Sequence, residues 1–371
     1  MWYYFLMSRG KNVDRIFLGI VGVLLVAGLV IFTSASLGLL ARTGASFSSV
    51  AVSQLVAIAI GCVLAYVISK IPYTLWRRYS FYIFLVSIVL TLLVFVPHIG
   101  LQFGGGKRWI GFAGVSFQPG EFLKIAFVIY CATWLSGVRE RIDSFKEGIL
   151  PIIIMLTIVG VILLKQPDTD TFVSIFLAAI GMFVVAGGKF RHLLLLGLIS
   201  VVGLSSLVYM RPYLMQRVTT FLHPASDPLG AGYQIQQSLI AIGSGKVFGR
   251  GFGQSIQKFS YLPEPIGDSI FAVATEEFGF VGGACLILLF LFFTIRGLRI
   301  AVKSPDLFGG LLATGIVILI LSGSFMNIAS ILGVIPLSGL PLLFVSHGGT
   351  AMIITLAEVG ILLNISRFRR I

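Results

Sequence analysis

Charged side chains are scarce in this sequence of 371 residues, since Asp, Glu, Lys and Arg together account for only 11% of it. Hydrophobic residues account for 57%, which is more than a soluble domain can bury in its core. The sequence also lacks a polar block long enough to form a separate globular domain. Apolar stretches long enough to cross a bilayer recur throughout. These absences exclude a soluble protein and predict a single polytopic membrane domain over residues 1–371.

Cysteine is almost absent, and its three copies, Cys62, Cys131 and Cys285, all lie in apolar stretches. They show neither the spacing of metal ligands nor a pairing pattern, so we expect no cysteine-based metal site. Their placement carries no information about the redox compartment.

Acidic residues are about half as frequent as basic ones, 14 against 27, which gives a net charge of +13. A surplus of this size raises the question of nucleic acid, and the positions of the basic residues answer it. Seventeen of the 27 fall in six segments, near residues 9–15, 70–78, 139–146, 189–191, 296–303 and 367–370. This is the positive-inside pattern of membrane proteins, which places both termini in the cytoplasm and points to membrane lipids, not nucleic acid.

The apolar runs predict an all-α integral membrane protein with about ten transmembrane helices and one large extracytoplasmic loop, about 211–268, before the eighth helix. We expect the helices at about 16–36, 50–69, 79–97, 121–137, 149–164, 171–188, 192–210, 269–295, 307–328 and 348–365.

The remaining ten basic residues are not explained by the orientation rule. They are Arg42, Lys107, Arg108, Lys124, Lys165, Arg211, Arg217, Lys246, Arg250 and Lys258. Like charges gathered without a counter-anion repel, so this set indicates an anionic ligand on the outer face. The alternative for any single residue is ordinary solvated loop charge.

The segment Gln102–Lys124 combines glycines with charge. Gly104, Gly105 and Gly106 allow a close backbone approach to a ligand just before Lys107 and Arg108, although the order of a P-loop is absent. Glu121 and Lys124 follow at i, i+3 on the next helix, which predicts an ion pair within the membrane. Such a pair also has a purely structural interpretation, since each charge neutralises the other for insertion.

The long loop contains two further patterns. Residues 233–242 alternate apolar and amide side chains, which predicts an amphipathic helix lying on the outer leaflet. The GRGFG sequence at 249–253 superficially resembles a dinucleotide fingerprint, but no strand precedes it, so we reject that interpretation. Nearer the C-terminus, residues 327–350 hold Pro336, Pro341 and four glycines, which predicts a broken segment lining the same outer cavity as the loop that carries Asp268.

The stretch Tyr261–Gly279 places Asp268 at the start of an apolar helix and Glu276 and Glu277 inside that helix. Carboxylates at and within a membrane are costly, and the cost usually marks function. Asp268 is the catalytic candidate, whereas Glu276 and Glu277 are expected to support the core through a cationic partner. The alternative for Asp268 is that it only caps the helix N-terminus.

Taken together, these motifs resemble the SEDS family (shape, elongation, division and sporulation) of membrane-embedded cell-wall polymerases, along nearly the whole chain. The blocks that carry the resemblance are KRWIGFAGVSFQPGEFLK at 107–124, QPDTDT at 166–171, DPLGAGYQIQQSLIAIGSG at 227–245, GQSIQKFSYLPE at 253–264, DSIFAVATEEFGFVGG at 268–283 and GVIPLSGLPLLFVSHGGT at 333–350. The chain departs from the family at Ile266 and Gly267, where a His and a Thr are usual, at Lys246, where a Gly is usual, and at His347. The sequence of these blocks is slightly closer to that of the division branch, FtsW, than to that of the elongation branch, RodA.

The resemblance implies an inverting peptidoglycan glycosyltransferase that polymerises lipid II into glycan strands at the outer face of the bacterial cytoplasmic membrane and releases undecaprenyl diphosphate, in cell division or elongation. Asp268 would be the general base, and cations would stabilise the leaving diphosphate. The expected substrate-binding residues are Lys107, Arg108, Glu121, Lys124, Arg217, Gln237, Ser238, Gln257, Lys258 and Ser346.

The family also implies a partner, a single-pass class B penicillin-binding protein that acts as the transpeptidase. No ligand cluster in the sequence demands a metal, although a divalent ion such as Mg or Mn could share the stabilisation of the diphosphate. Two other functions stay open: a lipid II flippase, which needs polar groups along a transbilayer path, and a noncatalytic membrane scaffold of the cell-wall machinery.

Overall fold

The computed structural model describes residues 12–43, 47–103, 106–112, 115–224, 230 and 232–368. Several residues singled out from the sequence lie outside this part, namely Arg9, Lys11, Gly104, Gly105, Arg369 and Arg370.

Each of the ten predicted apolar runs forms a helix. The helices are α2 (Arg15–Thr43), α3 (Phe47–Lys70), α4 (Thr74–Leu93), α5 (Pro119–Gly137), α6 (Leu150–Lys165), α7 (Thr169–Val185), α8 (Phe190–Met210), α12 (Ile270–Val302), α13 (Leu307–Ile331) and α14 (Gly349–Arg367). Among the described residues, eight helical segments are long and apolar enough to cross a membrane, a set that leaves out α5 and the 17-residue α7. The predicted all-α, multi-pass membrane fold is confirmed, and the side on which the termini lie stays a prediction.

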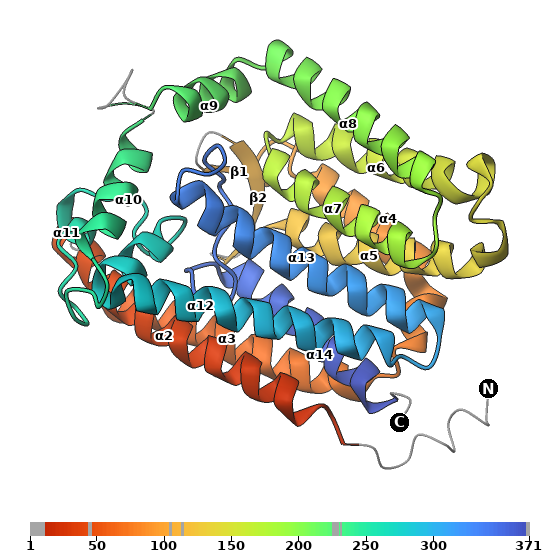
Figure 1. Cartoon of the computed structure of the whole chain (residues 1–371), viewed down its shortest axis with the longest axis horizontal. Helices are drawn as coiled ribbons and strands as arrows, with labels where there is room; N and C mark the ends of the chain where they lie inside the picture. The colour runs from red at the N-terminus through yellow and green to blue at the C-terminus, as the bar shows by residue number, and fades with distance from the viewer. Residues whose placement is uncertain are drawn as a thin grey trace.

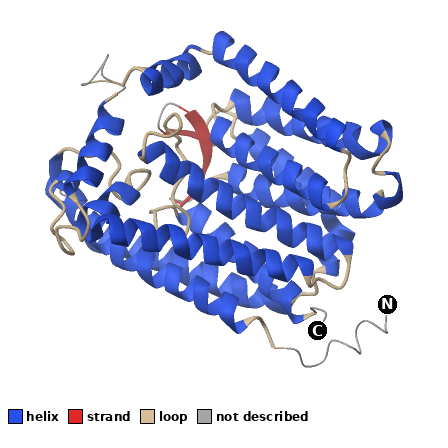
Figure 2. Ribbon diagram, viewed as in Figure 1, coloured by secondary structure: helices blue, strands red, loops and turns tan. Residues whose placement is uncertain are grey.

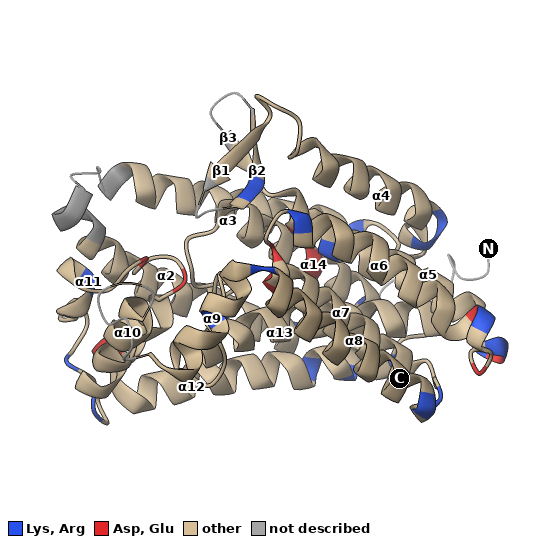
Figure 3. Cartoon of the chain, turned by 90° about the horizontal axis from the view of Figure 1, so that it is seen from above, with Lys and Arg blue, Asp and Glu red and all other residues tan. Residues whose placement is uncertain are grey.

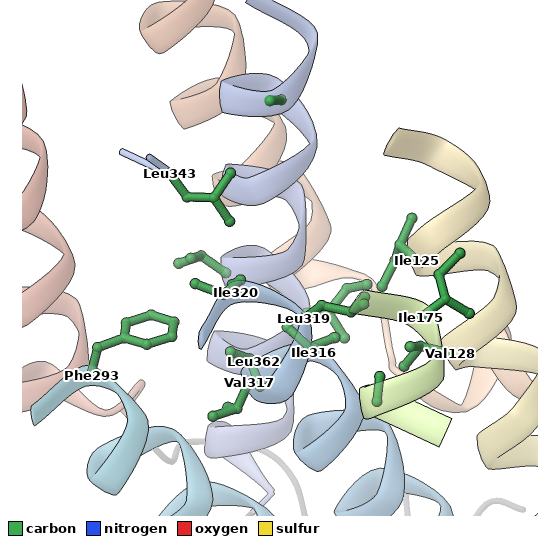
Figure 4. Packing of buried hydrophobic residues seen from close by; sticks show 14 of the residues in the cluster. Ile125, Val128, Ile175, Phe293, Ile316, Val317, Leu319, Ile320, Leu343 and Leu362 are labelled. Carbon is green, nitrogen blue, oxygen red and sulfur yellow. The ribbon is translucent and has the colours of Figure 1, made fainter. Parts of the chain in front are cut away.

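The helices run along the long axis of the molecule, and the start of α2 lies near the same end of the bundle as the end of α14 (Figure 1). Helix α13 is central, because it packs against α12, α7 and α5. Its buried Ile316, Val317 and Ile320 form part of the apolar core (Figure 4). Small residues allow these close contacts: a Cβ at Gly315 would lie 2.5 Å from Val128 Cγ1 on α5.

A small antiparallel sheet stands out among the helices (Figure 2). Its strands are β1 (Gly100–Phe103), β2 (Gly106–Phe112) and β3 (Val115–Phe117), in the order β1-β2-β3. Sequence reasoning treated this segment only as an outer loop. Leu101 pairs with Trp109 and Gln102 with Lys107, so Arg108 is the extra residue of a β-bulge. Lys107 is exposed, whereas Arg108 is half-buried.

The long loop is itself largely helical, with α9 (Pro212–Leu222), α10 (Tyr233–Ser244) and α11 (Gln257–Ser260). The helix expected over 233–242 is therefore confirmed as α10. It buries Ile235, Ser238 and Ala241 and packs against α12. The segment between α13 and α14, residues 332–348, contains no helix or strand, as its prolines and glycines predict.

Helix α12 is broken at Gly279, whose φ of +68° lies in the left-handed region that favours glycine. The loop segment 246–251 runs against this break. The amides of Arg250 and Gly251 donate to the carbonyls of Glu276 and Glu277, and the amides of Phe280 and Val281 donate to the carbonyls of Lys246 and Val247. The backbone groups freed by the break are thus satisfied within the protein, as a membrane environment requires. Gly249 of the GRGFG sequence serves this contact, because a Cβ there would lie 2.1 Å from the Glu277 carbonyl oxygen.

Candidate active site

A cavity of about 270 Å³ opens beside Asp268. Its walls come from α9, α10, Asp268 just before α12, and the broken segment. The lining residues are Tyr213, Gln216, Arg217, Thr220, Phe221, Gln234, Ile235, Asp268, Leu337, Ser338 and Gly339. The prediction that the broken segment and the Asp268 loop share a cavity is confirmed.

Asp268 does not cap α12. The cap position belongs to Ser269, and no side chain makes a capping hydrogen bond there. Burial raises the pKa of Asp268 to about 7, the neighbouring acids Glu264 and Asp170 act in the same direction, and Arg108 and Arg217 oppose them. A carboxyl group with this pKa exchanges a proton readily at neutral pH, which is the property a general base needs.

Two arginines and two acids act electrostatically on Asp268: Arg108, Arg217, Glu264 and Asp170. In the view of Figure 3, blue Lys and Arg segments and red Asp and Glu segments lie close together near the β2 and α14 labels. Arg217 on α9 pairs with Asp170 at 3.1 Å, and the Gly339 amide donates to the same carboxylate at 2.9 Å. Arg108 on β2 lies 3.9 Å from Asp168 and donates to the Pro167 carbonyl.

Gly339 marks the point where the two arginines converge. A Cβ there would lie 3.8 Å from Arg108 Nη1 and 3.9 Å from Arg217 Nη2. We call Arg108, Asp168, Asp170 and Arg217 the charge cluster. Arg108 Nε and Asp168 Oδ2 are buried without a hydrogen-bond partner in the described structure, so the charge cluster retains unused bonding capacity.

The backbone around Asp268 is held by side chains from the C-terminal part of the chain. Asn327 Nδ2 on α13 donates to the Asp268 carbonyl and to the Leu340 carbonyl, both at 2.8 Å. Ser346 Oγ donates to the Gly267 carbonyl at 2.8 Å and accepts from the Leu342 amide at 2.9 Å. The Ser346 hydroxyl thus braces the loop that carries Asp268, and its expected substrate contact stays a prediction.

The ion pair predicted within the membrane is present. Lys124 Nζ lies 2.8 Å from Glu121 Oε2 on α5, and both side chains are buried. Glu358 on α14, also buried, interacts electrostatically with Lys124. Lys124 also interacts with Asp168, which links this buried group to the charge cluster.

Lys258 does not face the cavity. Its ammonium group lies 2.6 Å from Glu277 Oε1 and donates to Ser34 Oγ at 2.8 Å, with the side chain wholly buried. Glu276 accepts from Ser255 Oγ at 2.5 Å and lies 3.5 Å from Arg250 Nε. The expected supporting role of Glu276 and Glu277 is confirmed, whereas Lys258 belongs to the same support and not to the group around Asp268.

Three other expected substrate residues also lie apart from the cavity lining. Ser238 is buried and donates to the Gln234 carbonyl of its own helix. The backbone N–H of Gln257 donates a hydrogen bond to the Glu276 carboxylate, and Gln237 lies half-buried on α10. The structure thus brings together Asp268, Arg108 and Arg217, and through Lys124 it connects Glu121.

Sequence reasoning missed Asp170, Gly339, Asn327 and Glu358 as members of this site. Asp170 stood inside the QPDTDT block, where two acids near an apolar boundary gave a signal. Asn327 gave almost none, because a single amide within an apolar run has many structural roles. Within the described chain, no group of three or more His, Cys, Asp and Glu side chains is arranged to hold a metal ion.

The fold and the site together define a multi-pass helical membrane protein. At one end of its bundle, the Asp268 carboxyl group lies near two arginines, Arg108 and Arg217. Residues 14–371 match the cell cycle protein family of FtsW, RodA and SpoVE, and the chain belongs to that family. It is 41% identical over 317 residues to stage V sporulation protein E of Bacillus subtilis (strain 168), covering 85% of this chain and 87% of that protein. It is 37% identical over 360 residues to the probable peptidoglycan glycosyltransferase FtsW of Geobacter sp. (strain M18), covering 97% and 98%.

Solved structures show the same architecture. A chain from a peptidoglycan synthase complex that coordinates polymerization and crosslinking superposes with a TM-score of 0.78 at 26% identity, covering 96% of this chain and 98% of that one. A variant of the rod shape determining protein RodA of Thermus thermophilus superposes with a TM-score of 0.72 at 25% identity, covering 96% and 98%. The SEDS resemblance found in the sequence is thereby confirmed.

Proposed function

We propose that this protein is an inverting peptidoglycan glycosyltransferase that polymerises lipid II at the outer face of the cytoplasmic membrane. The observation that carries the proposal is Asp268, a carboxyl group with a pKa of about 7 that lines a cavity beside Arg217 and the rest of the charge cluster. Relatives named as peptidoglycan glycosyltransferases support the reaction class.

In the proposed step, a sugar hydroxyl of the acceptor attacks the anomeric carbon of the donor from the side opposite the diphosphate. Asp268 takes the hydroxyl proton as the new glycosidic bond forms. The bond between the anomeric carbon and the diphosphate oxygen breaks, its electron pair leaves with undecaprenyl diphosphate, and the configuration inverts. Arg108 and Arg217 stabilise the negative charge that develops on the leaving oxygens.

The distribution of charge supports the outer face for this cavity. The cavity lies at the Asp268 end of α12, whereas Arg299 and Lys303 lie at the other end of the same helix, as the positive-inside pattern expects of a cytoplasmic end. A transpeptidase of the penicillin-binding class is the proposed partner, since the structural neighbour comes from a synthase complex that joins polymerization to crosslinking.

The test is glycan-strand formation by the purified chain in liposomes supplied with lipid II and a candidate transpeptidase. Asp268→Asn should lower the rate by at least about 100-fold, the usual size of a general-base contribution, with lipid II binding and thermal stability retained. Asp306→Asn is the matched control, because Asp306 caps α13 by accepting from the Gly309 amide and Asn caps equally well. A near-normal rate for a folded Asp268→Asn protein would favour the flippase or the scaffold.

A further inference from the structure

An exposed aromatic patch lies at the break in α12, away from the cavity. Phe248 is 83% exposed, Phe280 73% and Phe252 53%. The backbone hydrogen bonds that join segment 246–251 to the helix place Phe280 and Val281 beside Lys246 and Val247. The apolar side chains from the loop and the helix therefore form one surface, which we call the break patch: Val247, Phe248, Phe252, Phe280 and Val281.

The height of the break patch follows from helix geometry. From Phe280 to Val302 the helix extends about 34 Å, slightly more than the hydrocarbon core of a bilayer, about 30 Å. Lys303 and Arg299 mark one membrane surface. The break patch therefore lies at the opposite membrane–water boundary, the level at which aromatic side chains gather in membrane proteins.

The break patch is also continuous with the face of α12 that meets lipid. Leu288, Phe292 and Ile295 are about half exposed along the apolar span below it. An apolar surface that continues from lipid into the interfacial layer fits the boundary between acyl chains and headgroups.

The residue beside the break patch, Lys246, is positively charged, which is complementary to the negative charge of the lipid phosphate layer. Lys246 is exposed, and no carboxylate in the described part of the chain forms an ion pair with it. Its φ of +49° lies in the left-handed region, which costs a residue with a Cβ free energy. The hydrogen bond that the Lys246 carbonyl accepts from the Phe280 amide holds this backbone within the protein, and a lipid phosphate in contact with the exposed ammonium group adds to that stabilisation.

We propose that the break patch is an interfacial membrane anchor, in which Phe248, Phe252 and Phe280 enter the outer leaflet and Lys246 binds phospholipid phosphates. The anchor holds the loop that leads to Asp268 at a fixed height above the bilayer. The inference is independent of the reaction proposed above, because it concerns only the contact with lipid.

Spin-label depth measurements test the anchor in full-length protein reconstituted in phosphatidylglycerol-containing vesicles. The exposed Cys62 and Cys285 are replaced by Ala, the buried Cys131 is kept, and a label is placed through Phe248→Cys. We expect the label to be accessible to oxygen and shielded from a water-soluble nickel chelate. Phe292→Cys is the control within the lipid, and Gln254→Cys, an exposed polar position of the same loop, is the control in water.

Two outcomes overturn the anchor. One is nickel accessibility at position 248 equal to that at position 254. The other is a label shielded from nickel only when a transpeptidase is added, which would make the break patch a protein interface.

A second measurement isolates Lys246. Lys246→Gly relieves the left-handed strain, so its melting temperature should rise by roughly 1–3 °C in a maltoside detergent, which has no phosphate. In phospholipid vesicles the rise should vanish or reverse, because the phosphate contact is lost. An equal rise in both media contradicts the role of Lys246.

Discussion

The side-chain nitrogen of Asn327 lies 2.8 Å from the backbone carbonyl oxygen of Asp268, so a residue on α13 fixes the main chain of the proposed base. The same nitrogen binds the Leu340 carbonyl in the broken segment. One amide therefore ties together the two chain segments that line the cavity. The main chain of the proposed base is positioned by a side chain that does not line the cavity.

Asn327→Ala should reduce the turnover rate about tenfold or more with little change in KM for lipid II, because two buried carbonyl groups lose their donor and Asp268 shifts. The measurement is steady-state polymerisation together with thermal unfolding. Ser322→Ala, which removes a buried hydroxyl from the same helix that donates only to the Leu319 carbonyl, is the matched control and should keep its turnover. Equal losses in both variants would indicate general destabilisation of α13.

The rate should rise about tenfold per pH unit at acid pH and level off near pH 7, because only ionised Asp268 accepts the proton. Glu264→Gln removes a negative charge that raises the pKa of Asp268, so the midpoint should move to lower pH while the plateau stays. A pH-rate series on both proteins measures the shift. A midpoint that moves upward in Glu264→Gln would contradict the assignment of the titrating group.

Arg217→Gln should lower kcat/KM for lipid II by about 10- to 100-fold, since a cation next to the cavity is lost and the half-buried Asp170 carboxylate is left with the Gly339 amide as its close partner. Arg211→Gln is the matched control: Arg211 precedes the same helix, is exposed and lies outside the lining of the cavity. Similar effects in the two variants would favour diffuse attraction of an anionic substrate over a specific contact.

Lys258→Met should destabilise the protein by about 3–5 kcal/mol, because it leaves the Glu277 carboxylate buried without its cation. The double variant with Glu277→Leu should recover most of this loss. Thermal unfolding of both single variants and the double variant gives the coupling free energy. Additive losses would show that the pair does not act as a unit.

Much of the fold was predictable because spans are long, apolar and bounded by basic residues. The ten helices and the irregular 332–348 segment follow from hydropathy and from Pro336 and Pro341. The sheet at 100–117 was not predicted, since its strands are short and separated by glycines. Local sequence cannot show which distant segments meet.

In the candidate site too, local features were predictable from the sequence, whereas contacts between distant segments were not. Asp268 was predictable because a carboxylate at a membrane boundary is rare. The hydrogen bond from Asn327 joins positions 59 apart in sequence. The burial of Lys258 against Ser34 and Glu277 depends on how α2, α11 and α12 pack, which the sequence does not reveal. Loop cations are interpretable from sequence only when their carboxylate partners are also known.

The hydrogen bonds between segment 246–251 and α12 on either side of Gly279 couple the local unfolding of the outer loop to that of the helix. Arg250 and Gly251 lie in a loop, yet their amides donate to helix carbonyls and complete the ladder of α12. Their protons should exchange with solvent as slowly as those of the helix, and not at the rate of a surface turn. The loop and the outer half of α12 therefore form a single unit of local unfolding, in which neither can come apart while the other stays intact.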